Sequence, residues 1–204
     1  MRLYLIRHGK TERNIADILN GQMDDLLSEE GKEQAHTLAK KLSNIQFNSI
    51  RSSDLSRAYD TAQIIASYQP NLIVVQTDTK LRERYFGLYE GRPIEHLRTI
   101  SKKAGYEYMS DYYNHDTEIE HSTAIVQRVQ AFLDNNIIHT DQQTIGIISH
   151  GSTLREYLSH HLNIHGSDYL GHFMPIENTG LTILDIDTDK NLTRIVTYND
   201  FSHL

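Results

Sequence analysis

The chain has 204 residues, with 20 Lys and Arg against 27 Asp and Glu, no cysteine and a formal net charge of −7 at pH 7. The lack of cysteine excludes disulfide scaffolds and thiol catalysis, and the negative charge argues against a nucleic-acid-binding face, which would be basic. No apolar run approaches the roughly 20 residues of a membrane span, and the apolar N-terminal stretch is too short for a signal peptide. We therefore expect a cytoplasmic protein with neither nucleic acid nor membrane as a partner.

Strands and helices are expected to alternate along the first part of the chain. Residues 3–6 form an apolar strand, and a helix follows that Ser28 would cap, with Glu29 and Glu30 in its positive first turn. A short strand near residues 48–51 precedes a second helix, for which Asp54 is the candidate cap. The β-branched run at residues 72–75 predicts a further strand.

The periodicity weakens between about residues 89 and 122, which are rich in tyrosine and predict a lid-like insertion into a single domain spanning residues 1–204. Residues 144–149 are apolar almost throughout, as in a central strand covered on both faces, and a helix follows at about 152–162. Two strands at residues 181–186 and 192–198 flank a hairpin loop. This order predicts an α/β fold, with a mainly parallel central sheet, helices on both faces and an antiparallel edge hairpin.

Two of the predicted strands end in a histidine followed by a glycine. Arg7 and His8 precede Gly9 at the end of the first strand, and His150 precedes Gly151 at the end of the central strand. Ligands of open α/β sheets bind at the carboxyl ends of the strands, and glycine lets a ligand approach the backbone closely. Each histidine alone could be a solubility or core residue. Parallel strands would bring both to one edge, which favours a functional site.

An arginine and a glutamate add to this candidate site. Arg57 lies in the first turn of a predicted helix, where a cation opposes the helix dipole unless an anion is bound there; a solvated surface arginine is the alternative. Glu83 follows the predicted strand at 72–75. A bound dianion would repel its charge and favour its protonated form, which makes it a candidate proton donor. The alternative for Glu83 is a salt bridge to Arg82 or Arg84.

Two arginines, two histidines and one carboxylate together predict a phosphoryl-transfer site. Guanidinium groups bind phosphate oxygens in a forked geometry, and a histidine can carry a phosphoryl group as a nucleophile. We expect neither a metal nor a cofactor, because Arg7 and Arg57 would repel a divalent cation and the chain has no zinc-protease, Walker or dinucleotide-binding pattern.

Four motifs occur in order along almost the whole chain: Arg7-His8-Gly9-x-Thr11-x-x-Asn14, Ser53-x-Leu55-x-Arg57-Ala58-x-x-Thr61-Ala62, Leu81-x-Glu83-x-x-Phe86-Gly87-x-x-Glu90-Gly91 and Ser149-His150-Gly151. Together they resemble the motifs of the histidine phosphatase superfamily, the phosphoglycerate-mutase-like proteins. The resemblance implies a three-layer α/β/α sandwich that acts, without a metal, on a small phosphorylated substrate; a homodimer is a possible assembly.

The resemblance also implies a role for each site residue. His8 would attack phosphorus to give a phosphohistidine, and Glu83 would protonate the leaving group and then activate water. The equatorial phosphate oxygens would be held by Arg7, Arg57 and His150. The phosphate pocket would also be lined by Asn14, Asn20, Gly21 and Gly151.

Several departures from the mutases of this family favour a phosphatase. The insertion offers Lys102 and Lys103 but no adjacent arginine pair, Lys10 stands where glutamate or glutamine is frequent, and Ser152 stands where mutases often have asparagine. A mutase-like or sugar-bisphosphate activity is the alternative among enzymes. The alternative from another class is a catalytically idle module that docks phosphoproteins, which the filled catalytic positions disfavour.

Overall fold

A mixed six-stranded sheet forms the centre of the protein. The computed structural model describes residues 1–138, 143–164, 174–187, 189–190 and 192–204. The sheet has the order β3-β2-β4-β1-β5-β6, and its strands are β1 (Arg2–Arg7), β2 (Ser49–Ser52), β3 (Gln76–Thr77), β4 (Thr144–Ser149), β5 (Leu181–Asp187) and β6 (Leu192–Asp200). The first four pair in parallel, whereas β5 runs antiparallel to both β1 and β6. This confirms the predicted sheet; part of the predicted hairpin loop, residues 188 and 191, lies outside the described residues.

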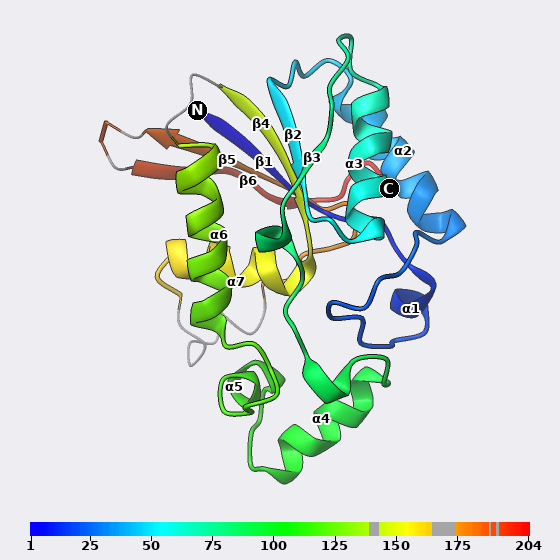
Figure 1. Ribbon diagram of the computed structural model, residues 1–204, viewed down its shortest axis with the longest axis vertical. Helices are drawn as coiled ribbons and strands as arrows, with labels where there is room; N and C mark the ends of the chain where they lie inside the picture. The colour runs from blue at the N-terminus through cyan, green and yellow to red at the C-terminus, as the bar shows by residue number, and fades with distance from the viewer. Residues whose placement is uncertain (139–142, 165–173, 188, 191) are drawn as a thin grey trace.

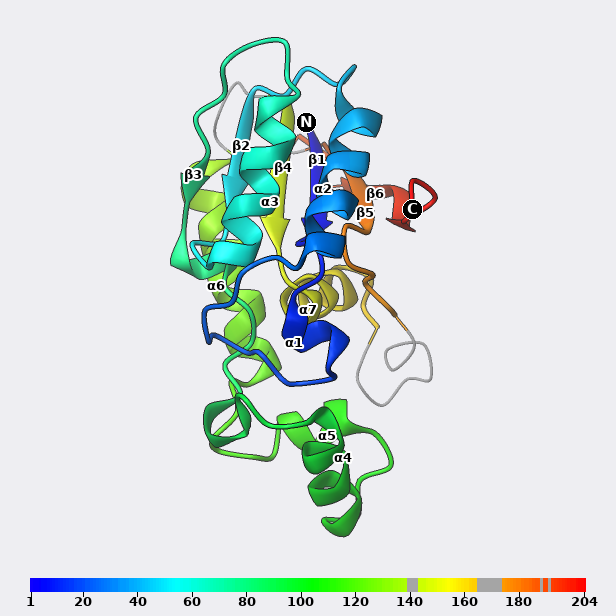
Figure 2. The same ribbon diagram turned by 90° about the vertical axis from the view of Figure 1, so that its right-hand side faces the viewer.

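Helices cover both faces of the sheet, in the three layers that the resemblance implied. The helices are α1 (Glu12–Ile15), α2 (Glu29–Leu42), α3 (Ser56–Ser67), α4 (Ile94–Lys103), α5 (Met109–Tyr113), α6 (Ser122–Asn136) and α7 (Gly151–His161), with short 3-10 turns η1 (Thr79–Leu81) and η2 (Gly87–Tyr89). Figures 1 and 2 show α2 and α3 on one face and α6 and α7 on the other. In the described part of the chain, no helix has both the length and the apolarity that crossing a membrane requires.

The apolar β1 is buried on both faces because its side chains alternate between two cores. Leu3 and Leu5 pack with residues of α6 and α7, whereas Tyr4 and Ile6 pack with residues of α2 and α3. All four are at most 5% exposed. Such continuous burial explains why a central strand reads as an unbroken apolar run.

The helix caps follow the sequence prediction in one case and depart from it in another. Ser28 caps α2, since its Oγ accepts a hydrogen bond from Gly31 N at 3.0 Å. The predicted cap of α3 is wrong: the N-cap residue is Leu55, which makes no side-chain cap bond. The carboxylate of Asp54 is instead engaged by Arg82 at 2.5 Å, and the first turn of α3 is satisfied by Asp24, which accepts from Ser56 N at 2.8 Å.

The predicted strand at residues 72–75 is also wrong. The strand there is the two-residue β3, Gln76–Thr77, at the edge of the sheet. Leu72 is 96% exposed and Val74 is 73% exposed, whereas Val75 is buried. Val75 and the partly buried Ile73 do pack against the core, but on this side β2 pairs only with Gln76 and Thr77, so residues 72–75 form no strand.

The predicted insertion lies beyond the carboxyl ends of β1 and β4. Figures 1 and 2 both show α4 and α5 there, around a small core of their own formed by Phe86, Leu97, Tyr113 and Ile119. Its first residues bond to the loop after α1, because Leu19 N donates to the Arg92 carbonyl at 2.9 Å and Gly91 N donates to the Leu19 carbonyl at 2.8 Å. The insertion therefore forms a wall facing the strand ends.

Candidate active site

The two histidines that follow β1 and β4 lie side by side. The two strands are parallel neighbours, with Arg7 opposite Ser149. The segments that follow them therefore leave the sheet at the same edge. The ring centroids of His8 and His150 are 5.0 Å apart, and the two residues are 3% and 0% exposed. The structure thus brings together the residues that the sequence placed at one edge.

The hydrogen bonds of His8 define its protonation state. Nδ1 lies 2.7 Å from the Gly9 carbonyl oxygen, which can only accept, so Nδ1 carries the proton. Arg57 Nε, which can only donate, lies 3.3 Å from His8 Nε2. Burial, followed by the charges of Arg57 and Arg7, lowers the pKa of His8 well below its ordinary value of 6.5. His8 is therefore a neutral imidazole whose Nε2 presents a lone pair, as a nucleophile requires.

Arg57 is a buried residue, and the surface alternative for it is wrong. Its side chain is 0% exposed. Nη2 donates to the Gly21 carbonyl at 2.7 Å and Nη1 donates to the Met23 carbonyl at 2.9 Å. These two bonds hold the planar guanidinium in one orientation, with Nε toward His8. The positive charge that opposes the helix dipole is thereby fixed beside the candidate nucleophile.

Arg7 and His150 present buried nitrogen atoms that have no partner among the described residues. Arg7 Nη1 donates to the Ile176 carbonyl at 2.6 Å, but Arg7 Nε and both ring nitrogens of His150 are buried and unpaired there. A Cβ at Gly151 would lie 3.4 Å from Arg7 Nε, so glycine keeps that side of the guanidinium open. An unsatisfied buried donor costs about 1–3 kcal/mol, which a bound anion would relieve.

Glu83 makes neither of the salt bridges that were its alternative explanation. The neighbouring Arg82 pairs with Asp54 at 2.5 Å, and Arg84 pairs with Glu156 at 2.7 Å. Both arginines therefore have other carboxylates as partners. Neither neighbouring arginine therefore neutralises the Glu83 carboxylate.

The Glu83 carboxylate is held by the amino end of α7. Oε1 accepts from Thr153 N at 3.1 Å and Oε2 accepts from Ser152 N at 3.1 Å, while Oε1 also accepts from Arg84 N at 2.8 Å. Free backbone N–H groups in the first turn of a helix favour a negative group there. Thr153 and Ser152 were not predicted to contact Glu83, and nothing in the sequence indicated that this carboxylate would bridge to α7.

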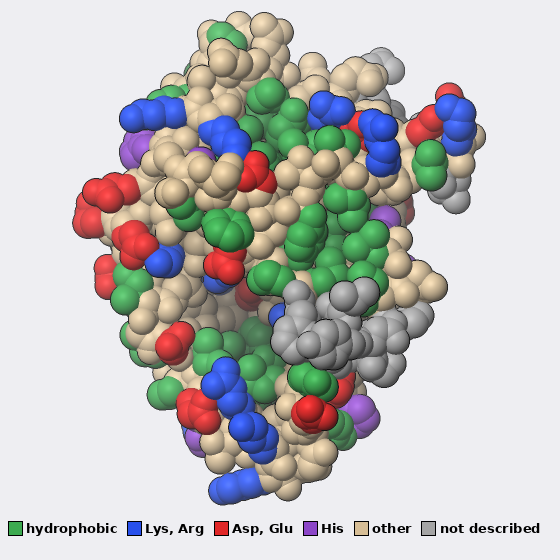
Figure 3. Space-filling view, turned by 180° about the vertical axis from the view of Figure 1, so that it is seen from behind, with side chains coloured by type: hydrophobic (Ala, Val, Ile, Leu, Met, Phe, Trp, Pro, Cys, Tyr) green, Lys and Arg blue, Asp and Glu red, His purple; other side chains and the backbone are tan. Residues whose placement is uncertain are grey.

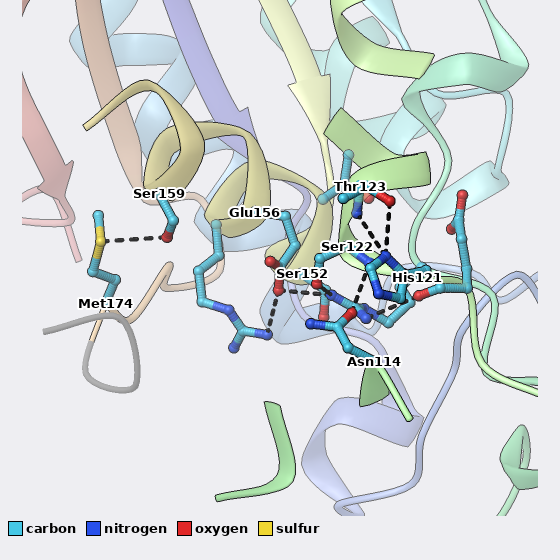
Figure 4. Close-up of polar contacts among 12 residues, drawn as sticks. Asn114, His121, Ser122, Thr123, Ser152, Glu156, Ser159 and Met174 are labelled. Atoms are coloured by element: carbon cyan, nitrogen blue, oxygen red, sulfur yellow. Dashed lines mark hydrogen bonds and ion pairs between the residues drawn. The ribbon is translucent and has the colours of Figure 1, made fainter. Parts of the chain in front are cut away.

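A buried polar network behind Glu83 connects α7 to the insertion. Arg84 is 0% exposed and donates to Ser122 Oγ at 3.0 Å, while Ser122 N donates to Asn114 Oδ1 at 2.9 Å. Figure 4 shows Asn114, Ser122 and Glu156 converging from the end of α5, the start of α6 and α7. The ion pair of Arg84 with Glu156 closes the network, so the segment that carries Glu83 is fixed on both sides.

A cavity of about 320 Å³ lies over these groups. Its lining includes all the predicted site residues except His150, namely Arg7, His8, Asn14, Asn20, Gly21, Arg57, Glu83 and Gly151. His150 lies beneath the cavity, against the ring of His8. Figure 3 shows a hollow between the body of the molecule and the insertion, with hydrophobic side chains on its lower border. The predicted residues thus form one cavity floor with His150 behind it.

The loop after α1 is shaped by local contacts. Asn14 Oδ1 accepts from Thr11 N at 3.2 Å, which leaves the Asn14 amide N–H₂ as the group able to meet a phosphate oxygen. Asn20 Nδ2 donates to Thr11 Oγ1 at 3.1 Å. Gly21 has φ +53°, and a Cβ there would overlap the Glu90 side chain, so this turn favours glycine.

The donor set of the site suits an anion better than a metal ion. Within the described ranges of the chain, no group of three or more histidine, aspartate or glutamate side chains is placed to hold a metal. The charges that lower the pKa of His8 are those of the Arg57 and Arg7 guanidinium groups. Two fixed cations beside a neutral imidazole are arranged to bind a phosphate dianion.

The rear of the site contains residues that the sequence did not indicate. Asn178 Nδ2 donates to the His8 carbonyl at 3.0 Å, and the Ile176 carbonyl accepts from Arg7. Arg128 of α6 donates to the Lys80 carbonyl at 2.6 Å. Each of these contacts is backbone-directed and joins segments far apart in the chain, which is why no local motif announces them.

Comparison with known proteins identifies the family of the chain. A broad-specificity phosphatase of Saccharomyces cerevisiae is 28% identical over 100% of this chain and 87% of its own length, and a protein named as a probable phosphoglycerate mutase of Proteus mirabilis is 32% identical over 100% of this chain and 95% of its own. A crystal structure of a phosphoserine phosphatase mutant from Entamoeba histolytica in complex with phosphoserine superposes with a TM-score of 0.81 at 26% identity, covering 100% of this chain and 98% of that one. The sequence model of the histidine phosphatase superfamily (branch 1) matches residues 3–200. The chain therefore belongs to the histidine phosphatase superfamily.

Proposed function

We propose that the protein is a metal-independent phosphomonoester hydrolase in which His8 is the nucleophile. The observation that carries the proposal is the state of the His8 ring: the Gly9 carbonyl holds the proton on Nδ1, which leaves Nε2 unprotonated, with Arg57 Nε 3.3 Å away. A neutral, oriented imidazole beside two guanidinium groups has the geometry for attack on a bound phosphate.

The reaction proceeds in two steps. In the first, His8 Nε2 attacks phosphorus, the bond between phosphorus and the ester oxygen breaks, and Glu83 delivers its proton to the departing oxygen. In the second, water attacks the phosphohistidine, its proton returns to Glu83, and the bond between nitrogen and phosphorus breaks. The Glu83 carboxylate, anchored by α7, lines the same cavity as His8 and serves both steps.

The remaining predicted residues hold the phosphoryl group. Arg57 and Arg7 supply fixed positive charge, and the unpaired Arg7 Nε is available to a phosphate oxygen. Burial, followed by the charges of Arg57 and His8, lowers the pKa of His150 well below 6.5, so His150 is neutral and contributes a single N–H donor. Together these donors stabilise the charge on the transferring group.

Hydrolysis is favoured over mutase activity by the insertion. Lys102 and Lys103 of α4 are exposed and do not line the cavity, so among the described residues the insertion brings no cation to the substrate. A phosphoglycerate mutase is the second candidate, because the Proteus mirabilis relative bearing that name matches the chain over its whole length.

Trapping the intermediate tests the nucleophile. Wild-type protein quenched during turnover of a ³²P-labelled ester should carry acid-labile phosphate, and His8→Ala should carry none and lose at least about 10³-fold in kcat. The exposed His36 provides a matched control, since His36→Ala should label and turn over normally. Normal turnover by His8→Ala would refute the mechanism.

The same assay separates the two enzyme candidates and the idle module. With 3-phosphoglycerate, a phosphatase releases inorganic phosphate, whereas a mutase yields 2-phosphoglycerate with little release. Tight binding of phosphate with neither product, and no label on His8, would indicate a binding module and overturn the proposal.

A further inference from the structure

The cavity above His8 has two chemically different ends. The predicted phosphate-binding residues occupy one end. The other end is lined by six apolar side chains, which we call the apolar wall: Ile18, Leu19, Phe86, Ile94, Met109 and Tyr113. Ile18 and Leu19 follow α1, Ile94 begins α4, and Met109 and Tyr113 belong to α5. Segments that are distant in the sequence thus combine into one apolar surface.

The apolar wall is held in place by the core of the insertion. Phe86 and Tyr113 are 3% and 7% exposed, and their rings meet edge to face at 5.3 Å. Arg84 lies 5.0 Å over the Tyr113 ring. This packing lies behind the half-buried Ile94 and Met109 and restricts the movement of the wall residues. The wall is therefore a preformed surface on which a ligand can bury apolar area away from water.

Among the residues that the structure describes, few charged side chains line this end of the cavity. The basic side chains at the start of the insertion and on α4, Arg92, Arg98, Lys102 and Lys103, are exposed, and none lines the cavity. Outside the predicted phosphate-binding residues, the cation that lines the described part of the cavity is Arg155, whose side chain is 27% exposed and whose Nη2 lies 3.4 Å from Glu156 Oε1. Glu177 adds a negative charge at the rim. Among the described residues, a second anionic group on a substrate would meet one guanidinium, which shares Glu156 with Arg84, and an opposing carboxylate.

We propose that the leaving group is an uncharged apolar alcohol, alkyl or aryl, that packs against the apolar wall while its phosphate occupies the site at His8. This inference rests on the proposed hydrolase function and adds the substrate class. Burying one methylene group changes an equilibrium by about fourfold. We therefore expect kcat/KM to rise by about fourfold for each methylene added to an n-alkyl phosphate, until the wall is covered.

A homologous series of esters tests the inference. Unbranched primary alkyl phosphates from ethyl to hexyl share nearly the same leaving-group chemistry, so a difference in kcat/KM reports contact with the chain. The wild type should show the rise, with hexyl phosphate exceeding 3-phosphoglycerate. Ile18→Ser should flatten the rise, whereas Ile15→Ser, on the exposed side of α1, should leave the series unchanged. Ethyl phosphate turnover also confirms that each variant is folded.

The outcomes separate this inference from the hydrolase proposal. If ethyl and hexyl phosphate are hydrolysed equally, or if 3-phosphoglycerate is the better substrate and Arg155→Met removes that advantage, the leaving group is not apolar and the inference is wrong while the hydrolase stands. If no ester is hydrolysed and His8 takes no label, the hydrolase proposal itself fails and the inference fails with it.

Discussion

The replacement of Glu83 by glutamine tests the proposed acid most directly, because the change removes one proton-transfer group and keeps the size of the side chain. A leaving phenolate such as p-nitrophenolate departs without a proton, whereas an alkoxide does not. The contribution of one positioned acid is about 10²–10⁴-fold. We expect Glu83→Gln to lower kcat on an alkyl phosphate at least about 10²-fold more than kcat on p-nitrophenyl phosphate.

The structure also gives the expected cost in stability. Both carboxylate oxygens of Glu83 accept backbone N–H groups, from Thr153 at 3.1 Å and from Ser152 at 3.1 Å. In Glu83→Gln, the amide N–H₂ that replaces one oxygen would face a backbone N–H of α7, and two donors cannot form a hydrogen bond. Losing one hydrogen bond to a charged group costs about 1.5–3 kcal/mol, and at about 2–4 °C per kcal/mol for a chain of this size the Tm should fall by about 3–12 °C.

Steady-state kinetics with the two esters, on the wild type and on Glu83→Gln at a temperature where both are folded, provides the measurement. Glu90→Gln serves as the control, since Glu90 accepts from Gln22 N at 2.9 Å and Phe86 N at 3.0 Å and does not line the cavity; it should affect both esters alike. Equal slowing of both esters by Glu83→Gln would mean that Glu83 only supports α7, and the acid would lie elsewhere.

Two further predictions concern the electrostatics of the site. Activity should survive excess EDTA and be inhibited by vanadate, because Arg7, Arg57 and His150 supply the positive field and the donors; loss on chelation with recovery on adding a divalent ion would contradict this. The lowered pKa of His8 means that protonation, which blocks attack, begins only well below pH 6.5, so the acid limb of kcat/KM should lie there. Arg57→Met removes a charge that lowers this pKa and should move the limb to higher pH; a limb near 6.5 in the wild type would refute the assignment.

The sequence was sufficient where a local pattern corresponds to a local environment. The apolar run before His8 predicted a strand because both faces of β1 are covered. His150, which follows β4, was then expected beside His8, because neighbouring parallel strands end at the same edge of the sheet. Arg57 was identified by a local anomaly, a cation at the wrong end of a helix. These inferences needed no knowledge of distant contacts.

The errors arose where distant contacts decide the local structure. Asp54 is a residue type that often caps helices, but its carboxylate pairs with Arg82 instead. The start of α3 is bonded by Asp24, which lies 32 residues before Ser56 in the sequence. The apolar run at residues 72–75 would suit a strand, but on this side β2 pairs only with Gln76 and Thr77, which follow it, and Leu72 and Val74 are exposed. In both cases the tertiary partner, invisible in the sequence, outweighs the local preference.

The charge arrangement around Glu83 explains how one carboxylate can coexist with a phosphate-binding site. If Glu83 paired with Arg7 or Arg57, it would neutralise the charge that a phosphate needs. Backbone N–H groups of α7 hold it instead, while the neighbouring Arg82 and Arg84 are occupied by Asp54 and Glu156. The two site guanidiniums bond to backbone carbonyls, which orient them without cancelling their charge. Neither guanidinium is therefore held in an ion pair with Glu83, which suits the proposed phosphate binding, and the carboxylate still lines the same cavity.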